Sequence, residues 1–360
     1  MGSRMRRRVG VGARDGLGFA ASETVAAVAG TAAAILLLLA IYFGSRELRN
    51  FDSALIGYAV ALVFLAFGVV YRYARWLQSP PARRYFTKGW RSFLSWRNFR
   101  RFPLLVLQSL TSYLLLQRFI GRRGRTRWLA HQSVFWGVVL ATAITFPLVF
   151  GWIDFRAVPG PHTGYVMEVW GFRTAQFAPL SLLGWTAFHG LDLAAVLVLA
   201  GCGYFLRRRF RDREATTGQR LGYDFLPLVA LVAISVTGLL LTFSSVLLQG
   251  EGYEFLAIVH MATVVLTLVF IPFGKFFHVI QRPATVGVEV FKRTAIADTG
   301  VLPCRRCGEP LEAREFVSNL QDTMSELGLE FPEWTATCPR CKRLLRGEAY
   351  LERVKRGFRS

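Results

Sequence analysis

Histidine and cysteine are scarce in this sequence, which contains five of each among its 360 residues. The sequence also lacks any nucleotide-, flavin- or molybdopterin-binding motif, so nothing indicates that the chain carries the chemistry of those cofactors itself. Charged residues are few, at 19% of the chain, whereas hydrophobic residues make up 53% and the mean hydropathy is +0.35. This balance excludes an ordinary soluble protein of this size and indicates an integral membrane protein.

The formal charge of +21 does not indicate a nucleic-acid-binding protein, because the 44 lysines and arginines fall in blocks between long apolar runs. Six of these runs are long enough to cross a bilayer as helices of roughly 20 residues. They lie at about residues 24–44, 54–77, 129–152, 180–206, 225–248 and 254–281. A seventh run, 102–119, has only a short uncharged core and predicts an interfacial or re-entrant helix. We therefore expect an all-α, polytopic membrane helix bundle.

Basic residues mark one side of this expected membrane domain. Five Lys and Arg precede the first run, 14 lie between the second and third, six between the fourth and fifth, and 14 after the sixth. The alternate loops hold only four, so the two sides differ by 39 to 4. By the positive-inside rule, we expect a chain in a bacterial inner (plasma) membrane with both termini in the cytoplasm. It would comprise a basic N-terminus (1–23), a membrane domain (24–282) and a cytoplasmic C-terminal domain (295–360).

The C-terminal domain holds four of the five cysteines as two CxxC pairs, Cys304 with Cys307 and Cys338 with Cys341. Two such pairs present four thiolates at the spacing of a tetrahedral metal site. Apolar residues recur at helical spacing between the pairs and predict one amphipathic helix over 313–327. We favour a zinc-ribbon-like domain with one zinc ion because of this helix, and a rubredoxin-type iron site is the alternative.

Four of the five histidines lie in the expected spans, and these are His131, His189, His260 and His278. An ionisable side chain is costly in lipid, so each of them needs a partner or a ligand. A hydrogen bond between helices would satisfy any one of them taken alone. The fifth histidine, His162, lies in the loop between the third and fourth spans, where we expect it to be solvated.

Depth in the membrane arranges the four histidines as two pairs. His260 and His278 are 18 residues apart in one expected span, which corresponds to five whole turns and about 27 Å of α-helix. We expect His189 in the outer half near His260, and His131 near the inner surface with His278. Bis-histidine ligation needs one imidazole on each side of a haem at equal depth. The pattern therefore predicts two b-type haems, an outer one on His189 and His260 and an inner one on His131 and His278.

Two charged residues accompany these histidines. Asp192 lies three residues after His189 and projects from the same helix face. It would orient the imidazole, accept a proton from quinol, or make a plain buried polar contact. Lys275 lies one turn before His278. It would pair with a haem propionate or extend its ammonium group to the membrane surface.

The segment from His260 to His278 ends in Pro-Phe-Gly-Lys-Phe-Phe-His and resembles the last haem-binding helix of the respiratory nitrate reductase gamma subunit. Related membrane cytochromes accompany heterodisulfide reductases and dissimilatory sulfite reductases. In that family the last helix carries two haem ligands 18 residues apart near a Pro-Phe-small-basic motif. The family differs in having five spans, an outside N-terminus, both remaining ligands on one earlier helix, and no four-cysteine tail.

This resemblance implies a membrane cytochrome b subunit, part of a quinol-dependent oxidoreductase complex. Such a subunit exchanges electrons between quinol and a cytoplasmic iron-sulfur or molybdenum partner, and its other contact is membrane lipid. Two other classes stay open. A transporter would have broken helices and charged residues along a path through the membrane. A membrane scaffold would combine structural histidines with a zinc docking domain.

Overall fold

The computed structural model describes residues 14–158, 164–211, 221–329 and 331–357. Most of the basic N-terminus and His162 lie outside these residues. The described chain forms two units, each built from two stretches of sequence. The first unit contains the residues up to 75 and 118–280, and the second contains 76–117 and the residues after 280.

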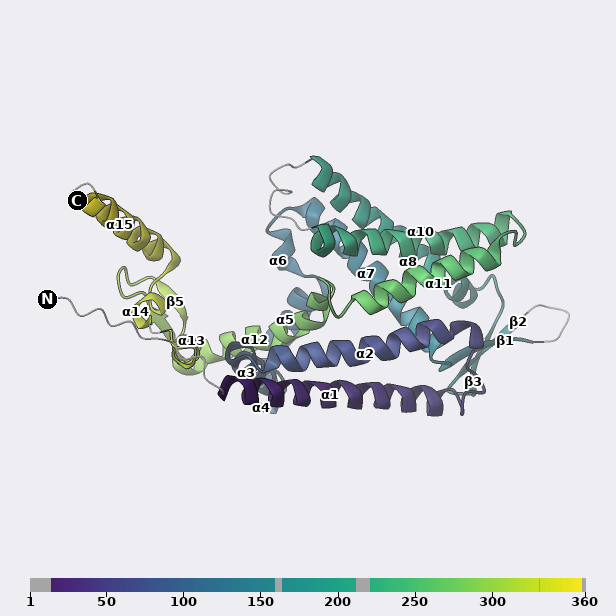
Figure 1. Ribbon diagram of the computed structural model, residues 1–360, viewed down its shortest axis with the longest axis horizontal. Coiled ribbons are helices and arrows are strands. Elements are labelled where there is room, and N and C mark those ends of the chain that lie inside the picture. The colour runs from purple at the N-terminus through teal and green to yellow at the C-terminus, as the bar shows by residue number, and fades with distance from the viewer. Residues whose placement is uncertain (1–13, 159–163, 212–220, 330, 358–360) are drawn as a thin grey trace. The chain divides into compact units, whose positions relative to one another are not determined.

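The first unit is a bundle of long apolar helices. Among the described residues, six helices are long and apolar enough to cross a membrane, which confirms the predicted all-α polytopic bundle. They are α1 (Arg14–Gly44), α2 (Ile56–Leu77), α7 (Arg125–Val149), α8 (Leu182–Arg211), α10 (Leu226–Leu247) and α11 (Tyr253–Phe270), shown in Figure 1. Three short helical turns precede α2, α7 and α10, namely η1 (Ser53–Leu55), α6 (Arg118–Gly121) and η3 (Leu221–Phe225).

Helices α7 and α8 approach each other closely because glycines lie at their contact. A Cβ atom on Gly137 would lie 2.8 Å from the carbonyl oxygen of Ala194, and one on Gly201 would lie 2.4 Å from a backbone oxygen of α7. Helix α10 contacts both α8 and α11. It therefore connects the two helices that carry His189 and His260.

The sixth apolar run is not one helix. Helix α11 ends before Pro272, and α12 (Phe277–Thr299) begins after an unwound segment. Pro272 has no N–H to contribute to a continuous helix. Arg72 of α2 donates to the carbonyl oxygens of Pro272 and Gly274, the second at 3.2 Å. The carbonyl groups that the break exposes therefore have a partner.

This break corrects the prediction of a continuous span over 254–281. His260 lies in α11, whereas His278 is the second residue of α12. The two histidines therefore do not share one helix, and the expected five-turn separation on one face is wrong. Hydropathy averaged over the run did not indicate the break, because Ile271, Phe273, Phe276 and Phe277 keep the run apolar across it.

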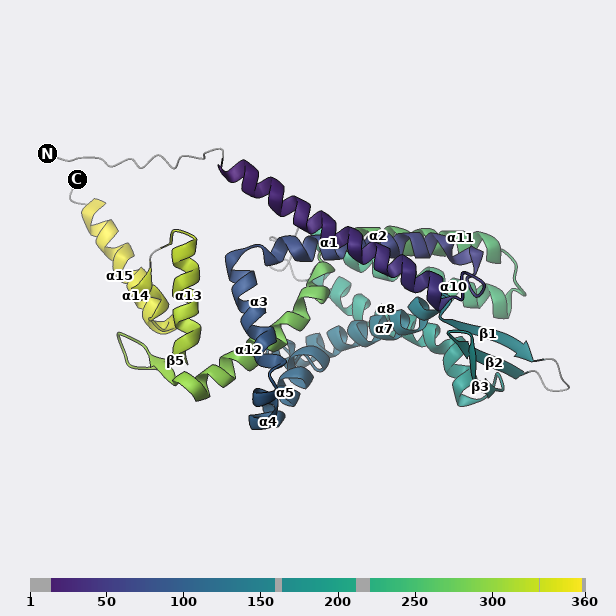
Figure 2. The ribbon, with the colours of Figure 1, turned by 90° about the horizontal axis from the view of Figure 1, so that it is seen from below.

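A small antiparallel sheet connects α7 to α8 at one end of the bundle (Figure 2). Its strands are β1 (Ile153–Val158), β2 (Gly164–Val169) and β3 (Phe172–Phe177). The turn between β2 and β3 has two residues at positive φ, Trp170 at 49° and Gly171 at 78°, as expected for a two-residue hairpin. The ring centroid of Phe155 in β1 lies 6.3 Å from that of Phe188 in α8. The sheet therefore packs on the beginning of α8, next to His189.

The second unit combines the connection between α2 and α7 with the C-terminal domain. It contains α3 (Pro80–Phe93), α4 (Trp96–Arg101), α5 (Pro103–Leu110), η2 (Thr111–Leu115), most of α12, β4 (Val301–Pro303), β5 (Pro310–Ala313), α13 (Arg314–Glu326), α14 (Pro332–Thr335) and α15 (Pro339–Gly357). The seventh apolar run forms the helical segment Pro103–Leu115, which is too short to count among the spans. Helix α13 confirms the helix predicted over 313–327.

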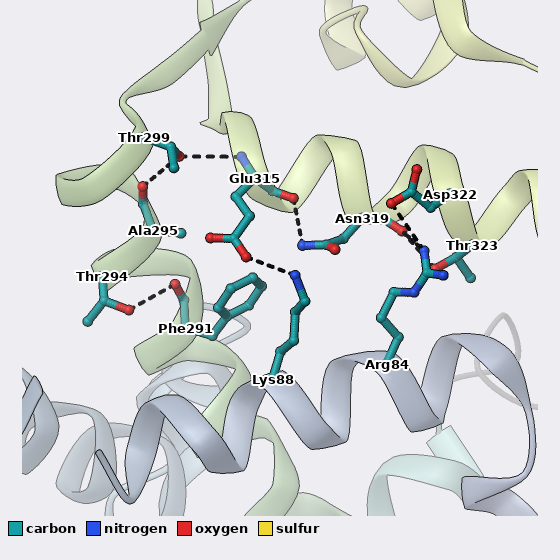
Figure 3. A network of polar contacts seen from close by, with 10 residues as sticks. All are labelled: Arg84, Lys88, Phe291, Thr294, Ala295, Thr299, Glu315, Asn319, Asp322 and Thr323. Atoms are coloured by element: carbon teal, nitrogen blue, oxygen red, sulfur yellow. Dashed lines mark hydrogen bonds and ion pairs between the residues drawn. The ribbon is translucent and has the colours of Figure 1, made fainter. Parts of the chain in front are cut away.

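Polar contacts attach α3 to α13 within this unit (Figure 3). The Lys88 ammonium lies 2.8 Å from a carboxylate oxygen of Glu315. Arg84 donates to the carbonyl oxygen of Asn319 at 3.0 Å and lies 3.5 Å from the Asp322 carboxylate. The cysteine-containing tail thus packs on residues that precede it by more than 200 positions, a contact that the sequence did not indicate.

Candidate metal centre and membrane histidines

The first cysteine pair lies in the turn between β4 and β5. The Cys304 N–H donates to the carbonyl oxygen of Glu309 at 2.8 Å, and the Gly308 N–H donates to that of Cys304 at 2.9 Å. Gly308 has a φ of 73°, a left-handed conformation that glycine adopts without steric cost. The turn brings the sulfur atoms of Cys304 and Cys307 into one cluster with those of the second pair.

The second cysteine pair lies where α15 begins. Cys338 directly precedes the helix, and Cys341 lies in its first turn. The Lys342 N–H donates to the Cys338 carbonyl oxygen at 2.9 Å, and the Cys341 N–H donates to the Cys338 sulfur at 3.4 Å. The Arg305 N–H, from the first pair's turn, donates to the Ala336 carbonyl oxygen at 3.1 Å. This last hydrogen bond joins the first turn to the segment that leads into the second.

The four sulfur atoms all lie within 4.8 Å of one another, and those of Cys307 and Cys338 are 3.7 Å apart. Thiolates at about 2.3 Å from a tetrahedral zinc ion are about 3.8 Å from each other, so this separation fits a metal site. It is far longer than the bond of a disulfide, about 2.0 Å. Cys304, Cys338 and Cys341 are buried, and Cys307 is exposed. The predicted four-cysteine site is confirmed as a cluster that can bind zinc or iron.

Two of these thiols, those of Cys304 and Cys341, have pKa values shifted in opposite directions. Backbone N–H groups, that of Cys338 first, lower the pKa of the Cys304 thiol to about 6. Burial, reinforced by the neighbouring thiols, raises the pKa of Cys341 to about 12. A metal ion binds thiolates, so its binding must release the protons that thiols such as Cys341 retain.

Side chains from outside the cluster fix α15 to the first cysteine turn. Arg306 donates to both carboxylate oxygens of Glu348 in α15, at 2.6 and 3.1 Å, and this contact lowers the pKa of Glu348. The ring of Trp334 lies beneath two cations of α15, Lys342 at 5.5 Å and Arg346 at 5.2 Å. These contacts attach α15 both to the first cysteine turn and to the segment that precedes Cys338.

In the first unit, His189 is held by a neighbouring carboxylate. Its Nδ1 atom lies 3.2 Å from Asp192, as the shared helix face predicted. Asp192 also accepts a hydrogen bond from Thr242 of α10 at 2.7 Å, and the Trp185 ring lies beside the imidazole. Because a carboxylate accepts, the Nδ1 atom of His189 carries the hydrogen, and the lone pair of the neutral ring is on Nε2.

His260 is held in the same tautomer by a hydroxyl group. Its Nδ1 atom lies 2.9 Å from Thr237 Oγ1 in α10. That hydroxyl donates its own hydrogen to the Ala233 carbonyl oxygen at 2.7 Å, so its oxygen accepts from His260. A Cβ atom on Gly238 would lie 3.3 Å from the imidazole, which therefore packs directly on the α10 backbone. In this tautomer the Nε2 atom of His260 carries a lone pair and could bind a metal.

His189 and His260 both lie seven residues after the first residue of their helices, α8 and α11. The fourth and sixth spans of a bundle run in the same direction, so both histidines are about 10 Å into their helices from the same side. No contact in the described part of the chain joins the two side chains. His260 contacts α10 at Thr237, whereas Asp192, the partner of His189, contacts it at Thr242, and these two threonines are about 140° apart around that helix.

The other two predicted ligands also lie near the first residues of their helices, α7 and α12. His131 is six residues into α7 and is partly buried. His278 donates from Nδ1 to the Lys275 carbonyl oxygen at 2.5 Å. The Lys275 ammonium pairs with Asp224 at 2.7 Å. Lys275 therefore has a carboxylate partner in this structure.

Sequence analysis did not single out four polar residues that contact this site. They are Arg72, Asp224, Thr237 and Thr242, which contact the unwound segment, Lys275, His260 and Asp192 in that order. Each is a polar residue within or beside an apolar run. Their polarity was the available signal, because a buried polar group in a span needs a partner. Which partner each one meets depends on helix packing, which local sequence does not specify.

Comparison with protein-family models, with curated proteins and with solved structures finds no match to this chain.

Proposed function

We propose that this chain is a membrane cytochrome b subunit that transfers electrons between quinol and a cytoplasmic iron-sulfur or molybdenum oxidoreductase. The segment from His260 to His278 supports this through its resemblance to the nitrate reductase gamma subunit. We also propose a bacterial inner-membrane location with cytoplasmic termini, which rests on the 39 to 4 distribution of basic residues.

The observation that carries the proposal is the hydrogen bonding of the Nδ1 atoms of His189 and His260. Each donates Nδ1–H to a fixed acceptor, which leaves Nε2 as a metal ligand. Oriented imidazoles with a hydrogen-bonded second nitrogen are typical of protein metal ligands. Their equal distance from the starts of two parallel spans supports placing them on opposite sides of one group.

When bound, a b-type haem accepts and donates single electrons. In the proposal, His189 and His260 hold the outer haem, and His131 and His278 hold the inner one. Asp192 orients His189 and is the nearest carboxylate for a quinol proton. A propionate at the inner haem would compete with Asp224 for Lys275.

A visible spectrum and a haem assay of the purified protein test the proposal. We expect a reduced-minus-oxidised b-type spectrum and two haems per chain. His189→Ala and His260→Ala should each remove the same haem, and the doubly substituted protein should lose no more than either single variant. His162→Ala, which changes a histidine outside the expected spans, is the matched control and should retain both haems. A colourless wild-type protein from haem-replete cells would contradict the proposal.

For the tail, we propose a zinc ion and a role in docking the soluble oxidoreductase. The helix α13 between the cysteine pairs supports zinc, because rubredoxins have aromatic loops there. Elemental analysis decides: one zinc per chain supports a docking module, whereas iron with a red rubredoxin-type spectrum places the tail in the electron path. Neither metal in a folded tail would remove the proposal for this domain.

One observation favours a second candidate, a transporter. Discontinuous helices line the binding sites of many transporters, and the segment between α11 and α12 is unwound. Its exposed carbonyl oxygens, however, already accept hydrogen bonds from Arg72. The haem assay separates the two candidates, because a transporter of this kind would be colourless.

A further inference from the structure

The connection between α2 and α7 is strongly basic. No acidic residue occurs between Asp52 and Asp154, although this stretch contains 14 lysines and arginines. Some of these have partners within the second unit, such as Arg101, which lies 2.7 Å from the Asp298 carboxylate. Arg91 and Arg100 are exposed and form no ion pair within the described residues. This part of the molecule therefore presents uncompensated positive charge.

The same connection exposes large apolar side chains. Exposed fractions between residues 94 and 107 are 72% for Leu94, 63% for Trp96, 47% for Phe99, 69% for Leu104 and 56% for Leu107. Helix α4 meanwhile buries a polar residue, Asn98, which donates to the carbonyl oxygen of Ser92 at 3.0 Å. Large apolar side chains are thus exposed beside exposed arginines, and an apolar surface of this kind marks a site of interaction rather than one that faces water alone.

The aromatic residues of α4 are arranged together with an arginine. The rings of Trp96 and Phe99 are stacked, with centroids 5.5 Å apart and planes at 16°. The Arg100 guanidinium lies 5.2 Å from the centre of the Trp96 ring. Tryptophan rings with adjacent arginines are typical of the interface between lipid headgroups and acyl chains.

We propose that this surface, formed by Leu94, Trp96, Phe99, Leu104 and Leu107 with Arg91 and Arg100, binds the headgroup region of an anionic lipid leaflet. We call it the α4–α5 surface. The spans α2 and α7 tether the connection at both ends, so a bilayer surface is always within its reach. The apolar side chains would enter the acyl boundary, and the two arginines would meet lipid phosphates. This inference does not depend on the proposed electron transfer.

Hydrogen–deuterium exchange of the full-length protein in nanodiscs tests the proposal. One bilayer contains phosphatidylcholine alone, and the other is an equal mixture of phosphatidylcholine and phosphatidylglycerol. We expect amides of residues 91–107 to exchange several-fold more slowly in the anionic bilayer. The difference should shrink at high salt, because the phosphate contacts are partly exposed. Equal exchange in the two bilayers would overturn the proposal.

Two matched variants identify the groups involved. Arg91→Gln/Arg100→Gln should remove most of the difference between bilayers, since each arginine near an anionic surface contributes about fivefold to the binding equilibrium. Arg340→Gln/Arg353→Gln removes the same charge from exposed positions of the tail and should leave the protection of 91–107 unchanged. A normal lipid response in the first variant would also overturn the proposal.

A last experiment distinguishes binding to a lipid leaflet from binding to a discrete phosphate site. Inorganic phosphate added to the detergent-solubilised protein should not protect residues 91–107, because it supplies no apolar boundary for Trp96 and Phe99. Trp96→Ser/Phe99→Ser should reduce protection in the anionic bilayer even though both arginines remain. Protection by inorganic phosphate equal to that of the anionic bilayer would show an anion site instead and contradict the leaflet proposal.

Discussion

The Asp192 carboxylate lies 3.2 Å from Nδ1 of His189 and at the same time accepts a hydrogen bond from α10. This one carboxylate therefore sets both the tautomer of the imidazole and the position of its helix. Removing its charge should weaken any metal or haem that His189 binds, without removing the ligand atom.

If His189 binds the proposed outer haem, we expect Asp192→Asn to weaken that binding about 10- to 100-fold, as for other groups that orient a ligating histidine. Haem per chain after extended dialysis is the measurement. Asp154→Asn, which changes a partly buried carboxylate of the β-sheet that pairs with Arg156 rather than with a histidine, is the control and should leave haem retention unchanged. Full haem retention in the Asp192 variant would mean that this carboxylate does not support a haem ligand.

The second prediction concerns the four-cysteine cluster. Cys338→Ser should reduce the metal content from one ion per chain to near zero and make the segment after residue 300 sensitive to trypsin, because structural metal binding contributes on the order of 10 kcal/mol to folding in small domains. A strong zinc chelator should have the same effect on the wild type. Cys202→Ala, at a buried cysteine of α8 outside the cluster, should leave both properties unchanged. Unchanged metal content in Cys338→Ser would exclude the cluster as the metal site.

The third prediction concerns the contact of α3 with α12. A Cβ atom on Gly89 would lie 2.8 Å from the backbone nitrogen of Val288, so Gly89→Val should force the helices apart and destabilise the second unit by about 2 kcal/mol or more. Gly347→Ala is the matched control, because nothing lies within 4 Å of its Cβ position in α15. That substitution should be neutral or stabilising by up to about 1 kcal/mol. Protease-monitored unfolding compares the two, and equal stabilities would contradict this packing.

The fourth prediction concerns Tyr85 of α3, whose ring lies 5.1 Å from that of Phe316. Its hydroxyl is buried with no hydrogen-bond partner in the described part of the chain, so Tyr85→Phe should be neutral or stabilising by about 1 kcal/mol. Tyr113→Phe removes a hydroxyl that hydrogen-bonds Arg293 and should instead destabilise.

The same tyrosine predicts a pH dependence. Burial raises the pKa of Tyr85 above its usual value of 10, so the native state holds this proton more tightly than the unfolded state. The corresponding stability is complete below pH 10 and is lost as the pH rises through the native-state pKa. Above pH 10 the advantage of Tyr85→Phe over the wild type should therefore grow. Unfolding measured at pH 8 and pH 11 checks this, and an advantage that does not change with pH would contradict it.

Much of the fold could be predicted because its signals are local. The six spans are long apolar runs, the four cysteines form two CxxC pairs, and α13 follows an apolar repeat at helical spacing. The contact of His189 with Asp192 also follows from spacing along one helix. Each of these inferences needs only neighbouring residues.

The features that sequence reasoning missed depend on residues far apart. A hydropathy average does not register that Pro272 lacks an N–H group. The partner of the unwound segment, Arg72, lies 200 residues earlier in the sequence. Arg84 and Asn319 are separated by 235 residues, so nothing local pairs α3 with the tail. The predicted five-turn separation of His260 and His278 failed because the break between α11 and α12 depends on such distant contacts, and the pairing of the four histidines stays a prediction.

The unequal exposure of the four cysteines would give an ion bound at the cluster only one side open to solvent. Three sulfur atoms are enclosed, and only that of Cys307 meets solvent. An incoming chelator or thiol must therefore attack at the Cys307 corner and displace that ligand first. Replacing Cys307 would leave three buried thiolates and an open coordination position at the solvent-facing corner, so a bound ion should then exchange faster.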